Sequence, residues 1–172
     1  MTGALRRVFG SGAPKGFTGA LAKDEHVLAW AAVGDGWLVA TTFGLWLPGA
    51  APRRLGWHLV SKATWSGGAL VVIEAEESEE AGRAVLLRDL PPVRFPLADP
   101  RKVPEVVYAR VTGAIRTSER QDALRAWFVQ RKVPGRDGVV LHVRPDPDAD
   151  LVEVRRVAAG VAEKLAGLRA DR

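Results

Sequence analysis

Apolar and polar residues alternate in short runs along most of the chain, which is typical of β-strands that bury one face. The pattern predicts strands at residues 26–33, 37–47, 55–65, 70–75 and 83–90. In the third run, Trp57 and Trp65 fall on one face and Lys62 falls on the other. Gly34-Asp35-Gly36 lies between the first two runs and favours a hairpin turn, because glycine readily adopts positive φ. We expect the acidic residues 74–80 to form a solvated loop.

The pattern changes after residue 90, where prolines remove the amide donors that a central strand needs. Valines at helical spacing predict a helix near 103–113, opened either by Asp99-Pro100 or by Pro104 in its first turn. Extended segments are expected at 114–118, 124–133 and 139–144. An amphipathic helix follows, from the N-cap Asp150 to about Arg169. Its apolar stripe contains Leu151, Val154, Val157, Ala158, Val161, Leu165 and Leu168.

These elements predict an α+β fold that is mainly antiparallel β. We expect a bent sheet or barrel closed by the C-terminal helix, with an extra helix near 103–113. A chain of 172 residues, 47% of them apolar, can bury a core as one domain without cross-links. Residues 1–20 are glycine-rich and basic and predict a mobile tail with one helical turn near Ala4, so the domain is assigned to 21–172.

The residue types that carry most catalysis and metal binding are absent or dispersed. The chain has no cysteine, which excludes thiolate nucleophiles and cysteine-ligated metals and fits a reducing cytoplasm. His26, His58 and His142 lack the short spacings of helical metal ligands. The glycine-rich residues 10–16 contain Lys15-Gly16, the reverse of the Gly-Lys order in a phosphate loop. We therefore expect a protein that is not an enzyme and holds no metal or cofactor.

Charge and hydropathy bear on the partner and the compartment. No apolar stretch is long enough to span a bilayer, and no apolar segment follows Arg6 and Arg7 as a signal peptide requires. The expected localisation is therefore cytoplasmic. The formal net charge is +5, with the basic excess in residues 101–172. Arginine and alanine are abundant, a bias that high-GC, actinobacterial-type coding produces by itself, so the charge is only a hint of an anionic partner.

Trp46 is a candidate for a partner surface. Five of the six tryptophans lie between residues 30 and 65, where large aromatic side chains most often fill a core. Alternation puts Trp46 on the opposite face from Trp37 and Leu47. That face of the sheet must then contact the terminal helix or form an exposed apolar patch, and such a patch would mark a partner surface.

A second candidate is the basic set Arg116, Arg125, Arg131 and Lys132, together with Trp127. If residues 124–133 are a strand, Arg125 and Arg131 share a face with Trp127. Arginines around an aromatic ring are the pattern of surfaces that hold single-stranded nucleic acid. The simpler interpretation is a solvated strand face with Trp127 turned into the core.

Residues 21–72 resemble the start of bacterial pleckstrin-homology-like and GRAM-type domains. The resemblance rests on Leu21, on Glu25-His26-Val27-Leu28, on the return run at 37–47 and on the strand at 57–65. It implies a bent, seven-stranded roll plugged by a C-terminal helix. The helix expected near 103–113 precedes the last strands, so a variant roll and a fold of two small lobes both remain open.

The resemblance also indicates a function. Members of this family that bind phosphoinositides use Lys or Arg near the first hairpin, whereas the turn here carries Asp35. We do not expect phosphoinositide binding there. The leading hypothesis is a non-enzymatic module that binds a protein or peptide through the pleckstrin-homology-like sheet. The alternative is electrostatic binding of nucleic acid or an anionic membrane surface through the basic second half and the tail.

Overall fold

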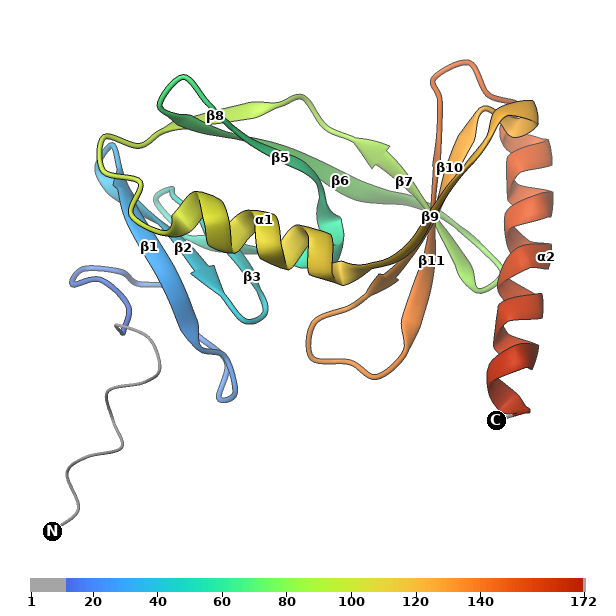
Figure 1. Ribbon diagram of the computed structural model, residues 1–172, viewed down its shortest axis with the longest axis horizontal. Coiled ribbons are helices and arrows are strands. Elements are labelled where there is room, and N and C mark those ends of the chain that lie inside the picture. The colour runs from blue at the N-terminus through green and yellow to red at the C-terminus, as the bar shows by residue number, and fades with distance from the viewer. Residues whose placement is uncertain (1–11, 172) are drawn as a thin grey trace, which may run out of the picture. The chain divides into compact units, whose positions relative to one another are not determined.

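A computed structural model describes residues 12–171, and it confirms the predicted α+β class (Figure 1). The strands form curled, mostly antiparallel sheets, and the described chain ends in a helix. Contacts divide the described residues into two compact units, 12–74 with 91–112 and 75–90 with 113–171. The assignment of 21–172 to one domain stays a prediction. The helical turn expected near Ala4 lies outside the described residues.

The first sheet of the first unit contains four consecutive antiparallel strands, β1 (Val27–Val33), β2 (Gly36–Thr41), β3 (Gly44–Leu47) and β4 (Arg53–Gly56). The predicted hairpin between β1 and β2 is confirmed, and Gly34 takes a φ of 54° in its turn. The run predicted as one strand at 37–47 is divided. Thr41 Oγ1 accepts the backbone N–H groups of Phe43 and Gly44, at 3.1 and 3.2 Å, and so closes a turn between β2 and β3.

The run predicted as one strand at 55–65 is divided as well. A 3₁₀ turn, Trp57–Leu59, separates β4 from β5 (Val60–Ser66). Trp57 is fully buried in this turn, and its indole N–H donates to the Thr41 carbonyl at 3.0 Å. Burial of this large side chain bends the backbone where alternation alone predicts a straight strand.

The second sheet of the first unit has β6 (Ala69–Ala81) between β5 and the short strand β8 (Val93–Pro96). Gly67 and Gly68 take φ values of 57° and 72° in the β5–β6 turn, as a two-residue hairpin loop requires. The prolines after residue 90 led us to expect no strand there. β8 forms nevertheless, because it is an edge strand and Pro96 occupies its last position.

Helix α1 (Val103–Ala114) completes the first unit and confirms the helix predicted near 103–113. Its buried side is formed by Val103 and Val107, which are one helical turn apart and fully buried. Pro104 lies in the first turn, where its missing amide costs no hydrogen bond. Tyr108 projects from the helix and is 69% exposed.

The second unit is a sheet covered by the C-terminal helix. Its strands follow the order β6 from residue 75 onward, β7 (Ala84–Asp89), β11 (Val139–Pro145), β10 (Ala126–Lys132) and β9 (Ile115–Gln121). β7 and β11 are parallel and the other neighbours are antiparallel. Helix α2 (Leu151–Ala170), red in Figure 1, packs on β7 and β11.

The predicted N-cap of α2 is confirmed, and its apolar stripe packs on the sheet with a small shift. Asp150 accepts the N–H groups of Val152 and Glu153. The most buried positions are Val154, Ala158 and Ala162, while Leu151 is exposed. The two alanines take the centre of the contact because small side chains let a helix approach a sheet closely.

The expectation of a solvated loop at 74–80 is wrong, because these residues are part of β6. Glutamate has a low intrinsic preference for strands, but cross-strand and tertiary partners override it here. Glu76 pairs with Arg88 on β7, and Glu79 pairs with Arg155 on α2 at 2.5 Å. Acidic side chains of β6 thus meet arginines, while Ala75 and Ala81 of the same strand are buried.

Candidate functional site

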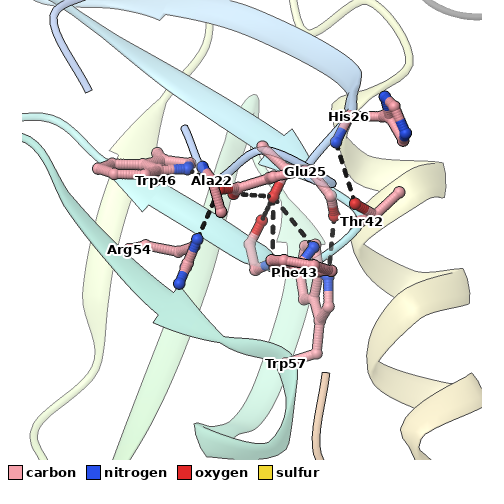
Figure 2. A network of polar contacts seen from close by, with 10 residues as sticks. Ala22, Glu25, His26, Thr42, Phe43, Trp46, Arg54 and Trp57 are labelled. Carbon is pink, nitrogen blue, oxygen red and sulfur yellow. Dashed lines mark hydrogen bonds and ion pairs between the residues drawn. The ribbon is translucent and has the colours of Figure 1, made fainter. Parts of the chain in front are cut away.

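A buried carboxylate joins the strands of the first sheet (Figure 2). Glu25 accepts hydrogen bonds from the Thr41 hydroxyl at 2.6 Å, from Trp46 Nε1 at 2.9 Å and from the Ala22 N–H at 3.0 Å. Its second oxygen also pairs with the Arg54 guanidinium at 2.5 Å. Each carboxylate oxygen therefore has two donors, and the group is saturated within the fold.

The pKa of Glu25 reflects these contacts. Burial raises the pKa, but the hydrogen bonds from Thr41, Ala22 and Trp46, with the charge of Arg54, outweigh it and hold the pKa below its usual value. The side chain is fully buried and stays ionised at neutral pH. A saturated, buried carboxylate of this kind fixes strand positions and has no free lone pair for a substrate.

Trp46 belongs to this network and does not form an exposed patch. The side chain is 6% exposed, and the ring of Phe17 lies edge-on to it with centroids 5.6 Å apart. The Trp46 ring is therefore covered by Phe17, which lies in the segment expected to be a tail. From the sequence we expected this face to contact the terminal helix or solvent. The Arg54 guanidinium carbon also lies over the indole, 5.7 Å from the ring centre.

An open groove of about 430 Å³ runs between the end of β5 and α1 in the first unit. Trp65 on β5 and Tyr108 on α1 line it, and both are substantially exposed, at 41% and 69%. The rest of the lining is mostly apolar: Ala63, Leu70, Pro100, Pro104 and Val107, with Arg101 and Glu105 as its charged members. Its size falls within the range of ligand sites, and its exposed rings are of the kind that anchors a partner.

The strand beside this groove has an unpaired edge. Within the described residues β5 pairs with β6 alone. Ser66 and Ala69 flank the two-residue turn and form a hydrogen-bonded pair. Hydrogen-bonded and non-hydrogen-bonded pairs alternate along antiparallel strands. The N–H and C=O groups of Trp65 and Ala63 therefore point away from β6. The same two residues turn their side chains toward the groove. Free backbone groups and an apolar groove therefore adjoin each other.

Arg101 forms the end of the groove nearest to the start of α1. Its φ of 52° is in the left-handed region, which is unusual for arginine. Its guanidinium carbon lies 3.7 Å from the centre of the Trp30 ring, and Trp30 in turn meets Trp37 edge-on at 5.3 Å. A close cation–π contact on β1 thus holds the turn that leads into α1.

The basic set predicted in the second half does not form one surface. Arg125 is outside the strand, in a left-handed conformation at the end of a 3₁₀ turn, and pairs with Asp148 at 2.5 Å. Arg116 and Lys132 are exposed, and both lie near one end of the β9–β10–β11 ladder, whereas Trp127 lies near the other end. The expected grouping of Arg125 with Arg131 on one strand face is therefore incorrect, because β10 begins at Ala126.

Arg131 and Trp127 do share a face of β10, but the arginine is buried. Arg131 is 6% exposed, and burial, with Arg144 nearby, lowers its pKa to about 10, so it remains charged at neutral pH. Trp127 is 37% exposed and lies near Arg120, at 5.9 Å. Arg120 forms a two-pronged pair with Asp146 at 2.7 and 2.9 Å, which raises the pKa of Arg120 and offsets its charge.

No group of three or more His, Asp or Glu side chains in residues 12–171 is arranged to hold a metal ion. No helix within those residues is both long and apolar enough to cross a membrane.

Comparison with known proteins adds no relative: the chain matches no family model, no curated protein and no solved structure. The functional conclusion therefore rests on the residues of this chain.

Proposed function

We propose that the protein is a non-enzymatic interaction module whose first unit binds an extended segment of another protein. The segment adds to the free edge of β5 as a further strand and inserts side chains into the adjoining groove. The observation that carries this proposal is the conjunction of unpaired backbone groups at Ala63 and Trp65 with an apolar groove on the same side. Strand addition supplies main-chain hydrogen bonds, and side-chain pockets supply specificity.

The order of elements in the first unit supports this proposal. Among the described residues this unit has seven strand segments, β1 to β6 and β8, followed by the helix α1. That is the sequence of elements implied by the resemblance to pleckstrin-homology-like domains, with α1 in place of the C-terminal helix α2. The C-terminal helix that the predicted fold includes is present as well, as α2.

The alternative hypothesis, electrostatic binding of nucleic acid or an anionic membrane surface, has less support. Arg120, Arg125 and Arg144 each have a carboxylate partner, which lowers the charge available to a polyanion. Of the predicted basic set, Arg116, Arg125 and Lys132 are exposed, and Arg125 is paired with Asp148. We also propose a cytoplasmic setting, on the sequence argument that a chain without cysteine fits a reducing compartment.

The test is selection of peptides from a displayed random library on the full-length protein, followed by measurement of affinity for two variants. Trp65→Ala removes one wall of the groove, and Trp127→Ala removes a similarly exposed tryptophan from the second unit. We expect Trp65→Ala to weaken the selected peptides by about tenfold or more, since exposed aromatic anchors dominate such contacts. Trp127→Ala should leave affinity within about twofold.

Two results would contradict the proposal. One is the failure of any peptide to enrich on the wild-type protein. The other is equal binding of the enriched peptides by the wild type and by a folded Trp65→Ala variant. Steeply salt-dependent binding of single-stranded nucleic acid, removed by Arg116→Gln with Lys132→Gln, would favour the alternative instead.

A further inference from the structure

The two faces of β5 differ in chemistry, and together they determine what kind of segment can be added; this inference rests on the proposed function. A strand added to β5 alternates its side chains between the groove side and the opposite side. Ala63 and Trp65 face the groove, so Lys62 and Thr64 face the other way. Each side of the added strand therefore meets a different set of residues.

The groove side favours apolar side chains. Its lining is dominated by Trp65, Leu70, Val107 and other uncharged residues. The two charged members, Arg101 and Glu105, have opposite signs, so this side has no net preference for an acid or a base. Burial of apolar area is the main gain available there.

The opposite side of β5 has a positive charge. Lys62 is exposed and makes no ion pair within the described residues. The pairing of Thr64 with Val71 and of Val71 with Arg94 places Arg94 on the same face of the sheet. Ile73, the partner of Lys62 on β6, is uncharged. A side chain that arrives opposite Lys62 on an added strand is therefore stabilised if it is acidic.

We propose that the groove binds an extended protein segment in which apolar residues alternate with acidic residues. The apolar side chains enter the groove between β5 and α1, and the acidic side chains lie beside Lys62 on the opposite face. This pattern distinguishes the bound segment from a generic apolar strand and from a basic one.

The experiment uses two synthetic peptides, Thr-Val-Glu-Val-Glu-Val-Thr and its counterpart Thr-Val-Lys-Val-Lys-Val-Thr, with the full-length protein. Affinities are measured by fluorescence anisotropy at low and at physiological salt. We expect the acidic peptide to bind the wild type about three- to tenfold more tightly than the basic one, as favourable against unfavourable cross-strand charges imply. Lys62→Glu should reverse the order. Lys132→Glu, an exposed strand lysine of the second unit, should leave it unchanged.

The remaining outcomes distinguish a failure of the acidic-segment proposal from a failure of the proposed binding function. Equal affinity of the two peptides for wild type, with loss in Trp65→Ala, overturns the acidic pattern and keeps the groove as a binding site. If library-selected peptides bind and neither designed peptide does, the acidic pattern is likewise overturned and the groove is kept as a binding site. If no peptide of any kind binds, both proposals fail. A dimer in sedimentation that Trp65→Ala dissociates would make a second copy the occupant and overturn the acidic-segment proposal. Matched thermal melts establish that each variant is folded.

Discussion

Replacement of Glu25 by glutamine should destabilise the protein far more than its small change in shape implies. One carboxylate oxygen accepts from Thr41 and Trp46, and the other accepts from Ala22 and Arg54. Glutamine keeps a single acceptor oxygen, so its NH₂ group must face one of these donor pairs. The least costly orientation turns it toward Ala22 and Arg54, because Arg54 can turn to water.

The expected magnitude follows from the bonds that are lost. A hydrogen bond to a charged group contributes about 1.5–3 kcal/mol, and a buried donor without a partner costs about 1–3 kcal/mol. The Arg54 side chain is about one-third exposed, so its loss is discounted for solvent screening. We therefore expect Glu25→Gln to lower the free energy of unfolding by roughly 2–4 kcal/mol at neutral pH, a large share of a typical total of about 5–15 kcal/mol.

The pH dependence gives a second, independent check. Because the folded-state pKa of Glu25 is lowered, its contribution is present above the unfolded pKa of about 4.3 and is lost as pH falls through the folded pKa. Protonated Glu25 then resembles glutamine in charge. The gap in stability between wild type and Glu25→Gln should therefore narrow as pH falls from neutral through this range.

The assay is urea denaturation followed by tryptophan fluorescence at a series of pH values. Glu80→Gln is the matched control, since Glu80 is exposed and makes no ion pair within residues 12–171. It should change stability by less than about 0.5 kcal/mol at every pH. A Glu25→Gln variant as stable as the wild type, or a gap that does not change with pH, would refute the reasoning.

Two further predictions concern packing. Phe17→Ala should uncover Trp46, lower stability by about 1–2 kcal/mol and increase the quenching of tryptophan fluorescence by acrylamide, whereas unchanged quenching would mean that Phe17 does not cover the ring. Ala158→Leu should overpack the contact of α2 with its sheet and cost about 1–3 kcal/mol in a thermal melt, while Gly160→Ala, with open space around its position, serves as the control.

The sequence predicts much of the fold because alternation and capping are local. The β1–β2 hairpin, the helix at 103–114 and the Asp150 cap each depend on residues within one element or turn. The predictions were wrong where contacts between residues far apart in the sequence determine the local structure. The acidic residues 74–80 extend as a strand because arginines remote in sequence pair with them, and Trp57 bends the chain because it is buried.

The candidate site was less predictable than the fold. Alternation did place Trp65 and Ala63 on one face, but the groove also needs Tyr108, some forty residues later. The position of Tyr108 outside the stripe of Val103 and Val107 was an available signal of exposure. Trp46 and Arg131 were misjudged because burial is a tertiary property that composition does not reveal.

The free edge of β5 also bears on the solubility of the protein. Unpaired N–H and C=O groups on an edge strand are a template for pairing between identical chains, and proteins restrain such pairing with charged side chains, especially lysine. Lys62 is the charged residue of β5. Lys62, which we propose selects an acidic segment, is therefore also expected to oppose edge-to-edge association of the empty protein. A segment bound at the same edge would cover these backbone groups, so we expect it to lower association of the protein further.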